Sequence, residues 1–401
     1  MTEWEVRPLG EVCRVVNGGT PKTSVPEYWG GEHRWITPAE MGKRSSPYVA
    51  DTSRRLTSLG LSNCSASLSP ANSVILSTRA PIGHLVINTE PMATNQGCRT
   101  LVPDSGIHDK YLYFYLYSIR DVLDALGTGA TFRELSAGVL KRITIPVPSL
   151  PEQQRIVEVL DEAFEGIAAA KANAEKNLRN ARVVFESQRR SVFTQRGDGW
   201  AERPLSELCD IKHGFAFKGE FFAPSGGYVV LTPGNFFESG GYRDRGAKQK
   251  YYSGEIPDGF VLSEGDMLVA MTEQAAGLLG SPILIPESGK FLHNQRLGLV
   301  TGKPGVPWTN EFFFHVFNTH DVRKAIYDSA SGVKVRHTSP TKIGDVVVAS
   351  PESLSEQARI VSELADLTAE TQCLESIYQR KLAALDELKK SLLHRAFSGQ
   401  L

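Results

Sequence analysis

The chain opens with Trp4-Glu-Val-Arg-Pro-Leu-Gly-Glu-Val-Cys13, and this stretch returns near its middle as Trp200-Ala-Glu-Arg-Pro-Leu-Ser-Glu-Leu-Cys209. The Trp, Arg, Pro, Leu, Glu and Cys residues keep the same register in both copies. Further along each copy, Pro151-Glu-Gln-Gln-Arg-Ile-Val157 is matched by Ser355-Glu-Gln-Ala-Arg-Ile-Val361. The repeated unit is far longer than the repeat of a solenoid protein. The sequence therefore predicts two similar domains in a pseudo-two-fold repeat.

The first part of each copy, residues 1–150 and residues 198–350, is rich in Gly, Pro, Ser and Thr. Short β-like runs such as Ser73-Val-Ile-Leu-Ser77 alternate there with short amphipathic stretches, for example Tyr111 to Leu126 and Glu311 to Tyr327. This mixture predicts one compact α+β domain in each part.

The second part of each copy, residues 151–197 and residues 351–401, changes to a helical period. Apolar or small residues follow a four-three alternation, broken where Asn177 and Gln188 take two of the expected positions. The predicted seam comprises Ile156, Leu160, Ala163, Ile167, Ala170, Ala174, Ala181, Phe185 and Val192, and in the second copy Ile360, Leu364, Leu367, Thr371, Leu374, Tyr378, Leu385, Leu388 and Leu392. This spacing is typical of a coiled coil.

A helix of about 40 residues is about 60 Å long. Two such helices, packed antiparallel, form a rigid spacer that can hold two domains at a fixed separation and rotation. The predicted fold class is therefore α+β, with two globular domains separated by two long antiparallel coiled-coil helices. The alternative is a helical hairpin that only dimerises the protein.

The charge balance argues against a nonspecific nucleic-acid coat, because such a protein is strongly basic. The chain has 44 Lys and Arg against 45 Asp and Glu, a net charge of −1. A domain whose positive charge is local stays possible. The five cysteines are scattered without a C-x-x-C pair, which disfavours a disulfide framework or a cysteine zinc site. We expect a cytoplasmic protein, because no membrane-spanning run or signal peptide is visible.

Familiar catalytic motifs are missing from the sequence. It contains no phosphate-binding G-x-x-x-x-G-K-[ST] loop, no H-E-x-x-H zinc motif and no G-x-S-x-G nucleophile elbow. The tetrapeptide that amino-methyltransferases place beside a flipped base is also missing. A binding function is favoured over an enzymatic one. A nuclease or methyltransferase with an unfamiliar motif and an adaptor that binds only proteins remain as alternatives.

Several segments together resemble the specificity subunit of type I restriction–modification enzymes. They are the Trp-x-x-x-x-Leu-x-Glu opening of each half, Leu76-Ser-Thr-Arg-Ala-Pro-Ile-Gly83, Ala93-Thr-Asn-Gln-Gly97, Ile145-Pro-Val-Pro-Ser-Leu-Pro-Glu-Gln-Gln-Arg-Ile-Val157 and the terminal Lys389-Lys-Ser-Leu-Leu-His-Arg-Ala-Phe-Ser-Gly-Gln-Leu401. The resemblance extends over essentially the whole chain. The second half departs from it where Ser355 replaces Pro151 and where Thr272-Glu273 replaces Thr78-Arg79.

The resemblance implies a non-catalytic DNA-recognition subunit. Each globular domain, 1–150 and 198–350, would recognise one half of a bipartite, asymmetric double-stranded DNA site. The helices, 151–197 and 351–401, would fix the spacer between the half-sites and bind two methylation subunits. Restriction subunits would add translocation and cleavage. The chain itself would need no cofactor or metal, because S-adenosylmethionine, ATP and Mg²⁺ would belong to the partner subunits.

Candidate DNA contacts follow from the groups that reach base edges and phosphates. The clearest basic patch is Arg243-Asp-Arg-Gly-Ala-Lys-Gln-Lys250, beside Tyr242, Tyr251 and Tyr252, and its alternative interpretation is a solvated loop. Two segments occupy corresponding places in the halves, Gly129 to Arg133 and Gly332 to His337. The complete set of expected DNA-binding residues is Lys43, Arg44, Arg54, Arg55, Arg79, Thr131, Arg133, Arg243, Arg245, Lys248, Lys250, Lys334, Arg336 and His337.

Two recurring features favour structure over DNA contact. Asn95-Gln96 and Asn294-Gln295 occur in both copies, whereas domains that recognise different half-sites should differ where they contact bases. We therefore predict a structural turn at both places. Trp4 and Trp200 are predicted to be core residues for the same reason.

Overall fold

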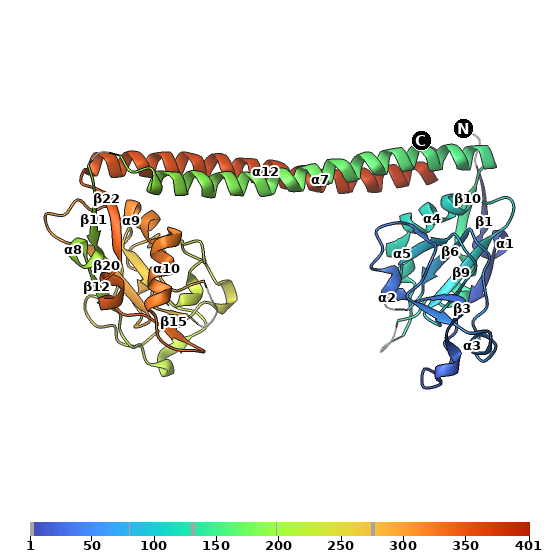
Figure 1. Cartoon of the computed structure of the whole chain (residues 1–401), viewed down its shortest axis with the longest axis horizontal. Coiled ribbons are helices and arrows are strands. Elements are labelled where there is room, and N and C mark those ends of the chain that lie inside the picture. Colours follow the sequence, from blue (N-terminus) through green and yellow to red (C-terminus); the bar gives the residue numbers. More distant parts are fainter. Residues whose placement is uncertain (1–3, 80, 130–132, 198, 274–276) are drawn as a thin grey trace. The chain divides into compact units, whose positions relative to one another are not determined.

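The structure, a computed structural model, describes residues 4–79, 81–129, 133–197, 199–273 and 277–401. The chain divides into two compact units: unit 1 contains residues 1–176 and 378–401, and unit 2 contains residues 177–377. Each unit combines an α+β domain with parts of two long helices, α7 (Leu150–Thr194) and α12 (Leu354–Phe397) (Figure 1). The predicted α+β fold with long paired helices is confirmed.

The described residues of unit 1 form three sheets. Strands β1 (Glu5–Pro8) and β10 (Thr144–Val147) form an antiparallel pair. A five-stranded sheet has the order β2-β9-β6-β7-β4, and a three-stranded sheet has the order β5-β3-β8. Their bounds are β2 Cys13–Asn17, β3 Trp29–Ile36, β4 Tyr48–Val49, β5 Arg54–Leu56, β6 Ser73–Ser77, β7 Leu85–Asn88, β8 Met92–Thr94 and β9 Cys98–Pro103. The helices are α1 Leu9–Val12, η1 Pro26–Tyr28, α2 Pro38–Met41, α3 Ser58–Ser62, α4 Asp109–Ser118, α5 Arg120–Ala125 and α6 Ala137–Arg142.

Unit 2 repeats the first two of these sheets. Strands β11 (Trp200–Pro204) and β22 (Val347–Pro351) pair as β1 and β10 do, and the order β12-β20-β16-β18 corresponds to β2-β9-β6-β7. Two smaller sheets have the orders β13-β15-β14-β19 and β17-β21. The strands are β12 Cys209–His213, β13 Phe222–Ala223, β14 Tyr228–Val230, β15 Tyr251–Tyr252, β16 Met267–Ala270, β17 Thr272–Glu273, β18 Pro282–Leu284, β19 Phe291–Leu292, β20 Leu297–Gly302 and β21 Arg336–His337. The helices are α8 Leu205–Leu208, η2 Gly219–Phe221, η3 Pro233–Asn235, η4 Gly246–Lys248, α9 Asn310–Phe317, α10 His320–Ser329 and α11 Pro340–Gly344.

The long helices are part of the core of each unit. In unit 1, Phe114 of α4 packs edge-on against Phe164 of α7, and Tyr111 packs against Phe397 of α12. In unit 2, Phe193 of α7 contacts Phe312 of α9. Burial of these apolar groups holds each domain against its helices. Trp4 and Trp200 pack against the cores of units 1 and 2, as predicted.

The two long helices run antiparallel. In unit 1 Lys171 of α7 forms an ion pair with Asp386 of α12, at 2.7 Å, and in unit 2 Arg182 pairs with Glu375, at 2.6 Å. Arg182 lies eleven residues after Lys171 in α7, and its partner Glu375 lies eleven residues before Asp386 in α12. Both pairs therefore fit one register.

The predicted seam is wrong at Leu374 and Leu388, and the helices also depart from the four-three spacing at Asn177 and Gln188, where the sequence pattern is broken. Asn177, Gln188, Leu374 and Leu388 are exposed, and the half-buried positions are the residues that directly follow them, Leu178, Arg189, Glu375 and Lys389. An α-helix with 3.6 residues per turn drifts relative to a strict seven-residue repeat. The contact line therefore advances by four residues at these points, where the sequence pattern predicts three.

The two ends of the chain lie close together in unit 1. The guanidinium of Arg155 donates a hydrogen bond of 3.0 Å to the carbonyl of Leu401. A Cβ placed on Gly399 would lie 3.7 Å from the Trp4 ring. Across the described ranges, no helix is long and apolar enough to cross a membrane.

Candidate nucleic-acid interface

The recurring Asn-Gln segments form the same turn in both units. The side-chain oxygen of Asn95 accepts the N–H of Gly97 at 2.9 Å, and that of Asn294 accepts the N–H of Arg296 at 3.2 Å. The carbonyl of each Asn lies so close to a glycine, Gly18 or Gly214, that any Cβ there would collide with it. The predicted structural turn is confirmed at both places, where the Asn side-chain oxygen is used within the turn.

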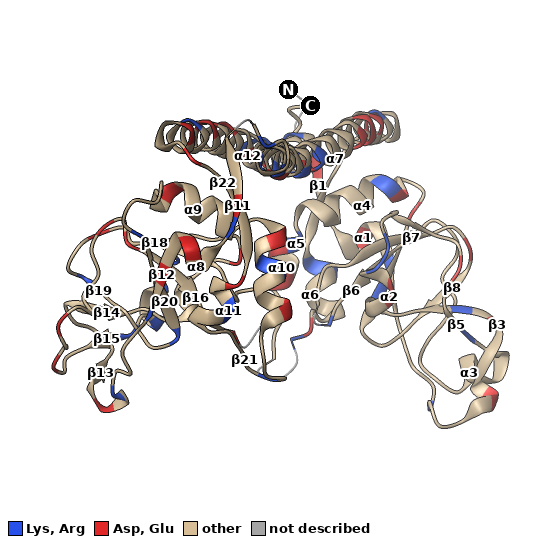
Figure 2. Cartoon of the chain, turned by 60° about the vertical axis from the view of Figure 1, so that its left-hand side comes forward, with Lys and Arg blue, Asp and Glu red and all other residues tan. Residues whose placement is uncertain are grey.

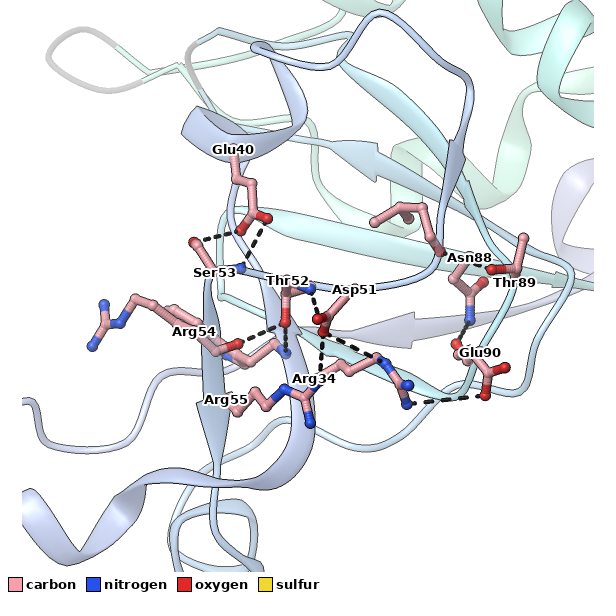
Figure 3. A network of polar contacts seen from close by, with 12 residues as sticks. Arg34, Glu40, Asp51, Thr52, Ser53, Arg54, Arg55, Asn88, Thr89 and Glu90 are labelled. Atoms are coloured by element: carbon pink, nitrogen blue, oxygen red, sulfur yellow. Dashed lines mark hydrogen bonds and ion pairs between the residues drawn. The ribbon is translucent and has the colours of Figure 1, made fainter.

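Several candidate arginines of unit 1 are already neutralised by carboxylates. Arg44 contacts Glu40 at 2.7 Å. Arg55 contacts Asp51, also at 2.7 Å (Figure 3). The N–H of Thr52 and the guanidinium of Arg55 lower the pKa of Asp51, so this carboxylate stays ionised. Arg34, which the sequence analysis did not single out, joins this network through Asp51 and Glu90. These groups hold residues 51–55, which comprise the start of β5 and the residues before it.

Arg54 differs from its neighbours. Its guanidinium lies 3.7 Å from the centre of the Trp29 ring and 5.1 Å from that of Trp35. In Figure 3 it points away from the ion-paired cluster. Among the residues that the structure covers, no carboxylate forms an ion pair with Arg54 or with the exposed Lys43. Stacking fixes the plane of the guanidinium and leaves its N–H edges open to solvent.

The segment around Arg79 is also built from ion pairs. Glu134 accepts hydrogen bonds from Arg79 and Arg99, both at 3.0 Å, and Arg99 was not predicted. Arg133 contacts the Asp124 carboxylate at 3.2 Å. Thr131, the remaining candidate here, lies outside the described residues. The network holds residue 134 against β9 and leaves Arg79 and Arg133 about half exposed, at 45% and 46%.

The basic patch of unit 2 contains several exposed cations. Arg243 lies over the Phe237 ring at 5.9 Å, and Lys250 over the Phe222 ring at 5.4 Å. Lys248 in η4 is exposed, whereas Arg245 is half-buried beside Gly234. Throughout the described part of unit 2, none of these four cations takes part in an ion pair. Figure 2 shows acidic residues interspersed with basic ones along the ribbon.

The expected aromatic neighbours of this patch have a structural role. Tyr252 is buried and packs against Phe217, at 4.9 Å between ring centres. Tyr242 packs edge-on against Phe291. These two tyrosines beside the patch therefore pack with aromatic neighbours inside unit 2.

The last candidates of unit 2 lie on and before β21. The Arg336 guanidinium stacks over Tyr327, 3.9 Å from the ring centre, and donates to the carbonyl of Tyr327 at 2.7 Å. His337 pairs with Thr272 across the two-stranded sheet, and both His337 and Lys334 are exposed. Arg336 thus stabilises the turn, whereas Lys334 and His337 are exposed to solvent.

The replacement of Thr78-Arg79 by Thr272-Glu273 changes the chemistry of the site. Glu273 is buried, and one of its oxygens accepts N–H groups from Gly277, Leu278 and Leu279 at 2.9–3.1 Å. Arg323 of α10 donates to the Leu279 carbonyl at 3.0 Å. Burial lowers the pKa of Arg323 to about 10, and Glu273 opposes that shift. In unit 2 this position therefore anchors a loop, in contrast to the solvent-exposed Arg79.

The described residues contain no group of three His, Cys, Asp or Glu side chains placed to bind a metal ion. Burial raises the pKa of Cys13, Cys98 and Cys209 to about 12, so these residues remain thiols at neutral pH. The exposed charged and polar groups of both domains suit binding.

Two histidines of unit 2 are held in their neutral form. Burial lowers the pKa of His293 to about 4, although Nε2 of its ring lies 3.0 Å from the carbonyl of Leu297. Burial and Arg189 lower the pKa of His315, also to about 4. In the unfolded chain both groups would take up protons near their ordinary value of 6.5. The unfolded state therefore binds more protons than the folded state between about pH 4 and pH 6.5.

We predict that unit 2 loses stability as the pH falls from 6.5 toward 4. The fully buried His293 accounts for about 3 kcal/mol of unfolding free energy at the bottom of this range. Hydrogen–deuterium exchange of unit 2 in urea, followed across the pH range, measures the effect. His293→Gln should flatten the pH dependence, and the same change at the exposed His320 should leave it as in the parent chain. Equal slopes for both variants would contradict the prediction.

The chain is similar to type I restriction enzyme specificity subunits in sequence. Residues 1–177 match the family model described as the type I restriction modification DNA specificity domain. The MjaIX type I restriction enzyme specificity subunit of Methanocaldococcus jannaschii is 31% identical over 229 residues, which cover 53% of each chain. The EcoR124I/EcoR124II specificity subunit of Escherichia coli is 34% identical over 167 residues, covering 40% of this chain and 41% of that one. The chain thus spans about half the length of the curated relatives it matches.

Solved structures match over the whole chain. A chain in a structure described as the basis of complex assembly and conformational transition of the type I R-M system has a TM-score of 0.77 at 17% identity. That match covers 100% of this chain and 99% of the other. The HsdS subunit from Thermoanaerobacter tengcongensis has a TM-score of 0.66 at 17% identity, with 100% and 98% covered. At these identities the likeness is one of fold.

Proposed function

We propose that this chain, whose residues 1–177 match the type I restriction modification DNA specificity domain, is the non-catalytic DNA-specificity subunit of a type I restriction–modification complex. Residues 1–150 and 198–350 act as target-recognition domains, each for one half of a bipartite, asymmetric site. Residues 151–197 and 351–401 form the helices that fix the spacer between the half-sites. Methylation subunits and restriction subunits supply S-adenosylmethionine, ATP and Mg²⁺ chemistry.

The observation that supports the proposal most is the repeat of one domain plan in the two units. The sheet order β2-β9-β6-β7 recurs as β12-β20-β16-β18, while the exposed charged groups differ between the units. A shared framework with different surface groups is what two recognition domains for different half-sites need, because base edges are distinguished by side chains and not by the fold.

Exposed apolar side chains on the helices favour the binding of partner subunits. Val183 and Val184 of α7 are 66% and 54% exposed, and Leu374 and Ile377 of α12 are 43% exposed each. All four lie in unit 2. Clustered apolar groups on a helical surface are typical of protein interfaces. A chain with two repeats of one domain fold is suited to bind two copies of a methylation subunit.

Co-expression with a methylation subunit tests the proposal. Sequencing of modified bases in the host DNA should find adenine methylation at one split sequence, and only when this chain is present. Methylation or cleavage by the purified chain alone would support a hidden enzyme. A complex that forms but binds no DNA would support the adaptor.

Within unit 1, Arg54 is the base-contacting candidate that its surroundings favour. A guanidinium stacked on Trp29 is planar, oriented and free of an acidic partner, so it can donate two parallel hydrogen bonds to guanine O6 and N7. Arg44 and Arg55 would first have to leave Glu40 and Asp51. Arg54 therefore differs from Arg44 and Arg55 in that it stacks on an aromatic ring and has no carboxylate partner among the described residues.

We predict that Arg54→Ala lowers methylation of the cognate site about 10- to 100-fold, as expected for the loss of one bidentate base contact. The methylated sequence should also become degenerate at one position. Arg55→Ala is the matched control, and it should change the rate much less because Arg55 is paired with Asp51. The prediction fails if Arg54→Ala leaves both rate and sequence unchanged, or if Arg55→Ala has the larger effect.

A further inference from the structure

Each long helix carries a buried glutamine at its fourth residue. Gln153 stands at this place in α7, which begins at Leu150, and Gln357 stands at the same place in α12, which begins at Leu354. Both side chains are completely buried. A buried amide is unfavourable unless its donor and acceptor both find partners, so this recurrence calls for an account of those partners.

Gln153 connects three segments of unit 1. Its side-chain oxygen accepts the backbone N–H of His108 at 2.8 Å. Its nitrogen donates to the carbonyls of Gly106 and Pro148, each at 2.9 Å. Residues 106–108 precede α4, and Pro148 directly follows β10. The amide thus connects the start of α7 to the segment before α4 and to the residue that follows β10.

Gln357 does the same in unit 2 with different neighbours. Its oxygen accepts from the backbone N–H and the hydroxyl of Thr309, at 3.0 and 3.1 Å. Its nitrogen donates to the carbonyls of Pro307 and Pro351, at 2.9 and 3.3 Å. Residues 307–309 precede α9, and Pro351 ends β22. The same three segments of the fold therefore meet at the same side chain.

These bonds do not serve helix formation. A glutamine in the first turn can cap the free N–H groups of its own helix, but here the oxygen binds N–H groups that lie before α4 and α9. Only two residues separate β10 from α7, and two separate β22 from α12. Such a short joint could still pivot. Bonds from one amide to two different segments remove that freedom, because all of them form at a single helix direction.

We propose that Gln153 and Gln357 are positioning residues that lock each long helix at one angle to its recognition domain and thereby restrict the protein to one spacer length. The inference rests on the proposed function, since it concerns how the two half-sites are held apart. A helix several tens of ångströms long converts a small change of angle at its start into a displacement of about one base-pair step, about 3.4 Å.

Variants Gln153→Met and Gln357→Met test the proposal, because methionine keeps the approximate volume and removes the hydrogen bonds. Each full-length variant is co-expressed with the methylation subunit, and the spacer lengths of all methylated sites are mapped. We expect methylation at sites one base pair longer or shorter to rise about tenfold, with both half-site sequences unchanged. Gln154→Met is the matched control: the next residue on the same helix is exposed, and it should retain a single spacer.

Gln153→Glu and Gln357→Glu extend the test if the methionine variants do not fold, because they keep the shape and an acceptor while losing both donated bonds. Thermal unfolding of every variant is measured in parallel. A lower melting temperature with an unchanged single spacer would assign the glutamines a structural role only and overturn the inference. Loss of methylation at every spacer would also overturn it. If the parent chain itself directs no bipartite methylation, the proposed function fails instead.

Discussion

Replacing residues 1–150 by the corresponding segment of a relative is expected to change one half of the methylated site and to leave the other half intact. The segment contains the whole five-stranded sheet of unit 1 together with both β1 and β10. Unit 2 has separate cores of its own, built around Phe312 and around Phe291. Because the exchanged part shares no strand with unit 2, the change should stay local.

The junction at residue 150 is placed between β10 and α7. The donor segment must supply apolar side chains where Tyr111 and Phe114 meet Phe397 and Phe164, or the domain will not pack on the helices. Mapping of methylated adenines in host DNA gives the result directly. The reciprocal exchange of residues 198–350 should change the other half only. Simultaneous change of both halves after a single exchange would contradict independent recognition.

Shortening both helices by one heptad is expected to move methylation to sites with a spacer about three base pairs shorter. Seven residues correspond to about 10 Å of helix, and one base-pair step to about 3.4 Å. Three base pairs also rotate one half-site by roughly a quarter turn or slightly more around the DNA axis, given about 10.5 base pairs per turn. Methylation of the original site should fall more than 100-fold, because both domains can no longer bind it at once.

The antiparallel register shows which heptads to remove together. Lys171 pairs with Asp386 and Arg182 with Glu375, so residues 174–180 of α7 face residues 377–383 of α12. Deleting both segments keeps the two ion pairs, and the removal of seven residues from each helix keeps the apolar residues on the same helix face. Deleting only 174–180 is the control, and it should destabilise the helix pair because Lys171 and Arg182 could no longer both pair. If the double deletion leaves the spacer length unchanged, the helices do not determine the distance between the half-sites.

Much of the fold could be predicted from the sequence, because it is encoded in local patterns. The run Ser73–Ser77 is β6, and the amphipathic stretches from Tyr111 and Glu311 became the pairs α4–α5 and α9–α10. The helices begin within a few residues of Pro151 and Ser355, as predicted. The duplicated Trp openings did not indicate their strand partners, because β1 and β11 pair with β10 and β22, which lie far along the chain.

The candidate interface was harder to predict, because ionic partners come from distant parts of the chain. Nothing near Arg79 in sequence indicates that Glu134 pairs with it, or that Arg99 shares that carboxylate. Arg54 and Arg55 are adjacent, yet one stacks on Trp29 and the other binds Asp51. In the amino-acid composition the two residues are equivalent, because each contributes one positive charge. The environment distinguishes them, and it depends on strand register, which sequence alone does not specify.

The meeting of the chain ends in unit 1 has a topological consequence. Leu401 bonds to Arg155 and Gly399 approaches Trp4, so a short peptide could join the two termini without disturbing the strands. The chain would then be a closed circle of two repeats, and it could be opened between them, near Gly197, to give a circular permutant with the second repeat first. Which half of the gene is translated first is therefore arbitrary for this architecture.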